Sequence, residues 1–104
     1  MTLRLELQHF NGCPNGPTLL GRVREAIEKA GLNVEFVETM VEDEVTAAQV
    51  KFLGSPTLLI NGQDLLGVPL AEQANLACRL YPAGLPSTDF IIQQMKVATF
   101  LPVR

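Results

Sequence analysis

The sequence is poor in several residue types that mark particular classes of protein. It has no tryptophan, one tyrosine, one histidine and two cysteines among 104 residues. One histidine and two cysteines cannot supply the four ligands of a structural zinc site. Zinc-finger functions are therefore excluded, and we expect the protein to work with no metal and no cofactor.

Basic residues and long apolar runs are also scarce. The eight Lys and Arg are scattered and the formal net charge is -3 at pH 7, so the chain lacks the positive patch that binds nucleic acid or an anionic membrane surface. No apolar stretch approaches the roughly 20 residues of a membrane span. The first residues alternate polar and apolar side chains, unlike a signal peptide. We therefore expect a cytoplasmic protein in which the two cysteines are thiols.

The remaining composition predicts one globular domain over residues 1–104. Hydrophobic residues make up 47% and charged residues 18% of the chain, which is enough apolar material for a core and too little charge for a disordered chain. Hydrophobic periodicity and turn residues predict strands at 3–10, 33–38, 57–60 and about 76–81. They predict helices at 18–30, about 42–53 and 87–100, the last ended by Pro102.

The predicted order is strand, helix, strand, helix, strand, strand, helix, an α/β fold whose first three elements form a parallel unit. Gly31 and Gly54 are expected to end the first two helices. Asn61-Gly62 predicts a tight hairpin turn. The stretch from Gln63 to Asn75 gives no clear pattern.

Four short motifs sharpen this order: Gly12-Cys13-Pro14, Gly54-Ser55-Pro56-Thr57, Asn61-Gly62 and Cys78-Arg79-Leu80-Tyr81. With these motifs together, the chain resembles a group of small bacterial thioredoxin-like proteins that carry Gly-Cys-Pro, Gly-Ser-Pro-Thr and Cys-Arg-x-Tyr in this order. The resemblance spans nearly the whole chain. It implies a βαβαββα fold, with a four-stranded mixed sheet flanked by helices, and redox chemistry at Cys13.

Cys13 is the candidate catalytic residue. It lies just before a predicted helix, where free backbone N–H groups stabilise a thiolate. If Asn15 caps that helix, Cys13 lies two residues outside the cap. The surrounding glycine, proline and asparagine favour a surface turn over a buried, inert thiol. A thioredoxin Cys-x-x-Cys pair would need a cysteine where Gly16 stands, so we expect a monothiol that forms mixed disulfides.

Cys78 is the second candidate catalytic residue, because it alone can resolve such a mixed disulfide within the chain. The sequence favours a different interpretation, a buried strand residue beside Leu76 and Leu80. If the two sulfurs meet, they are also suited to a soft cation such as Hg(II) or Cu(I), and mercury-related labels do occur around proteins of this kind.

The resemblance also implies a substrate-binding loop made by Pro14, Ser55, Pro56 and Thr57. Thioredoxin-like proteins hold the corresponding proline in the cis form, so we expect a cis bond at Ser55-Pro56, in place of a trans proline that only begins a strand. His9 is expected to be a partly buried structural residue and not a base. Arg79 and Tyr81 are read as a packed strand pair.

Two functions from different classes follow. The first is a thiol–disulfide oxidoreductase whose partner is a small thiol or a protein that carries a thiol or disulfide. The second is a thioredoxin-fold binding module for a peptide, a small thiol or a soft metal. A third interpretation is a homodimer formed through the apolar residues of the unclear stretch, Leu65, Leu66, Val68 and Leu70.

Overall fold

The computed structural model describes residues 2–100 and shows an α/β fold with a four-stranded mixed sheet and three helices. Its elements are β1 (Leu3–His9), α1 (Asn15–Ala30), β2 (Val34–Met40), α2 (Glu44–Val50), β3 (Thr57–Ile60), β4 (Gln63–Asp64) and α3 (Thr88–Phe100). The strand order is β2-β1-β3-β4, with β1 parallel to β2 and antiparallel to β3. The predicted fold class is confirmed at this level.

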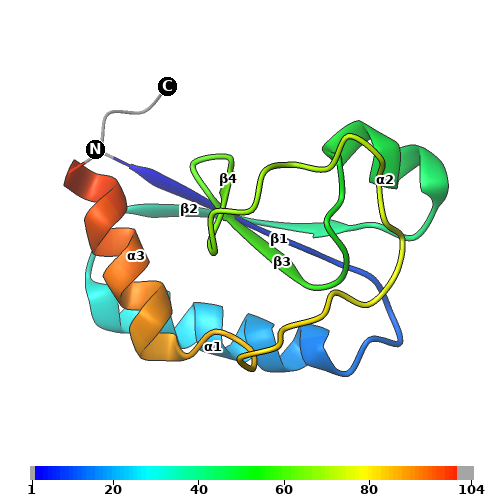
Figure 1. The fold of residues 1–104 in the computed structure, drawn as a ribbon. Helices are drawn as coiled ribbons and strands as arrows, with labels where there is room; N and C mark the ends of the chain where they lie inside the picture. The colour runs from blue at the N-terminus through cyan, green and yellow to red at the C-terminus, as the bar shows by residue number, and fades with distance from the viewer. Residues whose placement is uncertain (1, 101–104) are drawn as a thin grey trace.

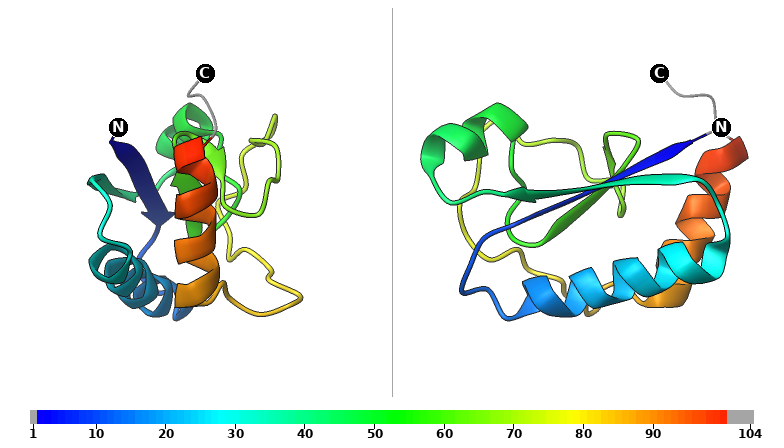
Figure 2. Two further views of the ribbon diagram at one scale, coloured as in Figure 1. Left: turned by 90° about the vertical axis from the view of Figure 1, so that its left-hand side faces the viewer. Right: turned by 180° about the vertical axis from the view of Figure 1, so that it is seen from behind.

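The main core lies between the sheet and two helices. Figure 1 shows α1 and α3 together on one side of the sheet and α2 on the other; the two further views in Figure 2 agree. Alternation along β1 turns Leu3, Leu5 and Leu7 to the α1 and α3 side. They pack there against buried residues of these helices: Leu19, Val23, Ala26, Ile91 and Met95.

A smaller cluster on the α2 side joins α2 to the loops around the candidate site. Val41, Ala47 and Phe52 are buried in it, and Phe10 packs against them. The rings of Phe10 and Phe52 meet edge to face, with their centroids 6.5 Å apart. This cluster holds the end of β1 and the approach to β3 in a fixed relation, which positions the loops that carry Cys13 and Ser55.

Several predicted boundaries shift for identifiable reasons. α1 begins at Asn15, three residues before the prediction, because Pro17 falls within the first turn, where its missing N–H costs nothing. α2 begins at Glu44, with the Asp43 side chain accepting from the Thr46 N–H, and it ends at Val50 because Lys51 adopts a left-handed conformation. The predicted end of the first helix at Gly31 and the hairpin at Asn61-Gly62 are confirmed, whereas the predicted end of the second helix at Gly54 is wrong.

The predicted last strand, residues 76–81, is wrong. The fourth strand is instead β4, the short return of the Asn61-Gly62 hairpin, whose Asp64 pairs with Leu59. Residues 76–81 form no strand; Cys78 makes a single isolated bridge with Ser55. The hairpin already completes that edge of the sheet, so the later segment pairs only with Ser55, just before β3.

The last helix begins where the sequence predicts, since Ser87 Oγ accepts from the Phe90 N–H. The predicted end at Pro102 lies outside the described residues.

Leu65, one of the four residues of the predicted self-association surface, is buried in the main core, whereas Leu66, Val68 and Leu70 are exposed. Among residues 2–100 no helix has the length and hydropathy that a membrane span requires.

Candidate functional site

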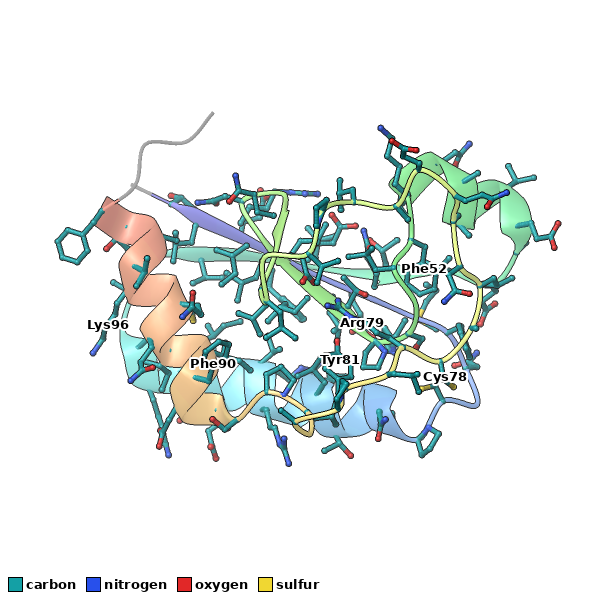
Figure 3. All side chains as sticks on the ribbon, viewed as in Figure 1. Phe52, Cys78, Arg79, Tyr81, Phe90 and Lys96 are labelled. Carbon is teal, nitrogen blue, oxygen red and sulfur yellow. The ribbon has the colours of Figure 1, made fainter. Side chains whose placement is uncertain are left out.

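The structure brings the two cysteines into contact. The Sγ atoms of Cys13 and Cys78 are 3.6 Å apart, although 65 positions separate them in the sequence. Both are free thiols. Cys13 comes from the loop between β1 and α1, and Cys78 comes from the irregular segment after β4, which also carries Arg79 and Tyr81 (Figure 3). The interpretation of Cys78 as a buried strand residue is wrong: it is exposed and lies outside any strand.

The exposure of Cys13 also differs from the prediction. Its neighbours Gly12, Pro14 and Asn15 are exposed, as a surface turn requires, but Cys13 itself is only 3% exposed. Its side chain turns inward and donates to the Ser55 carbonyl oxygen at 3.5 Å. The segment that carries Cys78 lies against the same serine, since Ser55 and Cys78 form a bridge. The solvent-facing sulfur of the pair is therefore Cys78.

The surroundings of Cys13 favour its thiolate. Burial alone opposes the charge, but the backbone N–H of Asn15, the side chains of Ser55 and Cys78, and the backbone N–H of Gly16 outweigh it, so the pKa of Cys13 lies below its ordinary value. The N-cap of α1 is Pro14, so Cys13 is one residue outside the cap and not two. This places its sulfur within reach of the first free N–H groups of the helix.

The pKa of Cys78 shifts in the opposite direction. Its hydrogen bond to Cys13, then burial, then the charge of the Cys13 thiolate raise the pKa of Cys78 above its ordinary value. A thiolate at Cys13 thus keeps a proton on Cys78, whose S–H donates to it. Ionisation of Cys13 therefore opposes ionisation of Cys78.

The Ser55-Pro56 peptide bond is cis, as predicted. Ser55, Pro56 and Thr57 are all buried, whereas Pro14, the fourth residue assigned to substrate binding, is exposed. The Ser55 hydroxyl oxygen accepts from the Phe10 N–H at 3.2 Å, which ties the start of β3 to the end of β1. Of the four, Ser55 accepts a hydrogen bond from the Cys13 sulfur through its carbonyl oxygen; a role of this loop in binding substrate stays a prediction.

His9 is buried beside Glu38, and its assignment as a structural residue stays a prediction. It is 8% exposed, and its Nε2 lies 2.9 Å from Glu38 Oε2 on β2. Its other ring nitrogen faces Gly16: a Cβ atom added there would lie 2.9 Å from His9 Nδ1, closer than real Cβ atoms approach. The buried His9 ring therefore leaves no room for a side chain at position 16.

Sequence reasoning missed a buried ion pair beside the cysteines. Arg79 donates to both carboxylate oxygens of Asp64, at 2.6 and 2.9 Å, and also to Thr57 Oγ1 at 3.3 Å. Burial works against the charge of Arg79, but the Asp64 carboxylate outweighs it and raises the pKa of the guanidinium. The side chains of Arg79 and Asp64 are only 9% and 1% exposed. Asp64 was missed because it lies in the stretch that shows no periodicity.

Tyr81 completes this arrangement. Its hydroxyl donates to the carbonyl oxygen of Pro56, and the Arg79 guanidinium lies 4.9 Å from the centre of its ring. Arg79 and Tyr81 thus bind the segment that carries Cys78 to the start of β3. The prediction of a packed strand pair for these two residues is wrong, because neither lies in a strand.

Burial raises the pKa of Tyr81 to about 12, against an opposing effect of the Arg79 charge. Since Tyr81 is the only tyrosine and the chain has no tryptophan, the ultraviolet absorbance of phenolate reports this residue alone. We expect the native protein to titrate near 12 and the urea-unfolded chain near its ordinary value of 10.0. A phenol with a raised pKa stabilises the fold fully below pH 10 and loses that contribution as the pH rises towards 12. A native midpoint near 10 would contradict the buried placement.

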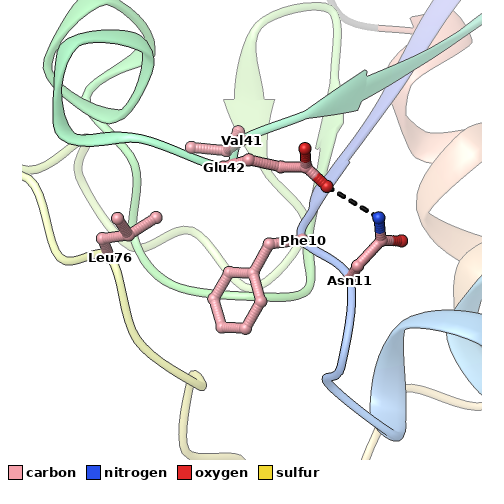
Figure 4. A pocket seen from close by; sticks show the side chains of 5 residues that line it. All are labelled: Phe10, Asn11, Val41, Glu42 and Leu76. Carbon is pink, nitrogen blue, oxygen red and sulfur yellow. Dashed lines mark hydrogen bonds between the residues drawn. The ribbon is translucent and has the colours of Figure 1, made fainter.

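A small pocket is lined in part by residues that lie near the two cysteines in the sequence. Phe10, Asn11, Val41, Glu42 and Leu76 line a volume of about 240 Å³ (Figure 4). Asn11 and Leu76 each lie two residues before a cysteine. The Asn11 side-chain amide donates to Glu42 Oε1 at 2.7 Å across its rim. The lining is otherwise mostly apolar.

Comparison of the chain with models of protein families, with curated proteins and with solved structures finds no match. The assignment of a function therefore depends on the geometry of the sulfur pair and its surroundings.

Proposed function

We propose that the protein is a thiol–disulfide oxidoreductase with a thioredoxin-like fold, in which Cys13 and Cys78 form the reacting pair. The observation that carries the proposal is the 3.6 Å contact between the two sulfur atoms, with the pKa of Cys13 lowered and that of Cys78 raised. A dithiol exchange cycle requires an activated thiolate and a second thiol that resolves the mixed disulfide. The contact supports such a pair, which we propose in place of the monothiol that the sequence predicts.

The proposed reaction has two exchange steps. The Cys13 thiolate attacks one sulfur of a substrate disulfide, a Cys13–substrate disulfide forms, and the other substrate sulfur leaves as a thiolate. Cys78 then gives its proton to that thiolate and attacks the Cys13 sulfur, which forms a Cys13–Cys78 bond and releases the second substrate sulfur as a thiolate. The substrate gains two electrons, one proton from Cys78 and one proton from solvent, which took it from Cys13 on ionisation, and the protein pair becomes a disulfide. A small dithiol resets the pair by the reverse exchange.

The cysteine variants test this proposal. With hydroxyethyl disulfide as oxidant, we expect wild-type protein to lose two hydrogens and to form an internal bridge, seen by mass spectrometry. Cys78→Ser is expected to stop at a mercaptoethanol adduct on Cys13. Cys13→Ser is expected to react much more slowly, because the remaining Cys78 has no activating N–H groups.

The pH dependence of alkylation supplies a second readout. Peptide mapping after alkylation of the wild type is expected to give Cys13 an apparent pKa below that of a free thiol, about 8.5. A value at or above that of a free thiol, or a Cys13→Ser variant that reacts as fast as wild type, would refute the catalytic role of Cys13.

A second candidate, binding of a soft cation, is favoured by the same sulfur contact. Two thiolates suit two-coordinate ions such as Cu(I) or Hg(II). Within the described residues no group of three His, Cys, Asp or Glu side chains is arranged to hold a metal ion, so the site would offer two ligands. Stoichiometric Cu(I) binding that needs both cysteines, in a protein whose pair fails to exchange with disulfides, would favour this function over the first.

A further inference from the structure

The backbone of Ser55 lies next to the Cys13 sulfur, and another segment of the same chain already takes its hydrogen-bonding groups. The Ser55 carbonyl oxygen lies 3.5 Å from Cys13 Sγ. An extended peptide that binds beside a sheet pairs with free backbone N–H and C=O groups. Here the Ser55 N–H donates to the Ala77 carbonyl oxygen at 2.8 Å, and the Ser55 carbonyl oxygen accepts from the Arg79 N–H at 2.9 Å. Residues 77–79 thus take the hydrogen bonds that a bound peptide would make.

This internal occupant also places a sulfur where a substrate sulfur would lie. Cys78 is the residue between the two hydrogen-bonded ones, and its sulfur contacts Cys13. We name residues 77–81 the covering segment. It runs beside Ser55 as a one-residue parallel bridge, and the contacts that hold it determine whether a peptide can displace it.

The covering segment is firmly anchored. Arg79 forms a bidentate ion pair with buried Asp64, and the Tyr81 hydroxyl donates a hydrogen bond to the Pro56 carbonyl oxygen. Its backbone also fits closely against Gly54: a Cβ atom added there would lie 2.9 Å from Arg79 Cβ and 3.0 Å from Arg79 Cα. Displacing the segment would leave a desolvated guanidinium and carboxylate without partners, which is strongly unfavourable.

We propose that the covering segment restricts the Cys13–Cys78 pair to small, low-molecular-weight disulfides and thiols and excludes extended polypeptides. This inference rests on the proposed exchange function. Cys13 is 3% exposed, so only a compact reactant reaches it past Cys78.

Two matched oxidants test the restriction. One is hydroxyethyl disulfide; the other is a flexible peptide whose single cysteine is joined to mercaptoethanol, so that attack on the peptide sulfur releases the same leaving group as the small disulfide does. We expect wild-type protein to form its internal bridge about tenfold or more faster with the small disulfide than with the peptide, after each rate is divided by that of free cysteine with the same oxidant. A peptide that reacts as fast as the small disulfide overturns the restriction and leaves the exchange function standing. A protein that reacts with neither oxidant overturns both.

A variant that loosens the covering segment should remove the discrimination. Arg79→Ala breaks its main anchor, while Asp64 keeps its hydrogen bonds from the Leu66 and Val68 N–H groups. We expect the ratio of small-disulfide to peptide rates to fall about tenfold in this variant. The matched control is Arg22→Ala, which removes hydrogen bonds to the carbonyls of Leu85 and Pro86 on a more distant part of the same connection. An equal fall in both variants contradicts a specific role of residues 77–81.

Amide hydrogen exchange tests the anchoring without any redox reaction. In the Cys13→Ser/Cys78→Ser double variant, we expect the Ser55 and Arg79 amides to exchange within about tenfold of the Leu5 amide in the central strand. Rapid exchange of both amides in a protein whose β1 stays protected would show that the covering segment opens freely, and it would overturn the restriction.

Discussion

Replacing Asp64 by alanine is expected to lower the free energy of unfolding by about 3–5 kcal/mol. The substitution leaves the Arg79 guanidinium buried without its carboxylate partner, and it also removes the acceptor of the Leu66 and Val68 N–H groups. Urea unfolding followed by circular dichroism would measure the loss. Since Arg79 holds the covering segment, the same variant is expected to lose the close contact of the two sulfurs and to form the internal bridge more slowly.

Asp43→Ala is the matched control for Asp64→Ala. It removes a carboxylate that caps α2 by accepting from the Thr46 N–H, and this aspartate is fully exposed. We expect a much smaller loss of stability and an unchanged rate of bridge formation. If the two aspartate variants lose similar stability, the Asp64–Arg79 pair is not the buried anchor described above.

Gly54→Ala is expected to be the next most damaging substitution. Gly54 has a φ of +114°, a conformation that costs other residues about 1–3 kcal/mol. The added methyl group would also press on the backbone of Arg79 at 3.0 Å. Because the covering segment must move away to relieve this contact, we expect a lower midpoint of urea unfolding together with slower closure of the Cys13–Cys78 bridge.

Gly21→Ala provides a control that is expected to change the stability in the opposite direction. Gly21 lies inside α1, is exposed, and has open space where the methyl group would go. Alanine in a helix interior is more stable than glycine by roughly 0.5–1 kcal/mol, so this variant is expected to gain stability and keep its redox behaviour. A Gly54→Ala variant that behaves like Gly21→Ala would contradict the tight fit between residue 54 and Arg79.

Periodicity predicted the elements that build the main core. The alternation of Leu3, Leu5 and Leu7 located β1, and the apolar run before Asn61-Gly62 located β3, because in both cases side-chain burial follows directly from local spacing. The short β4 was missed, since two residues, Gln63 and Asp64, are too few to show a period.

The parts of the site that depend on distant contacts could be predicted only in part. The position of Cys13 before a helix and the cis bond at Ser55-Pro56 followed from local motifs and the family resemblance. The burial of Cys13 and the exposure of Cys78 did not, because both depend on a segment that approaches from far along the chain. The sequence alone predicts Asp64 to be an exposed surface residue, because its burial depends on the guanidinium of Arg79, 15 positions away.

The contact between Gly16 and His9 has a consequence for how such a protein changes over evolutionary time. A single codon change at Gly16 would place a cysteine three positions after Cys13, but its first carbon would collide with an enclosed imidazole that is already bound to Glu38. That route to a neighbouring dithiol is closed unless the imidazole is replaced as well. The sulfur that does lie beside Cys13 comes from a remote stretch of sequence, at Cys78.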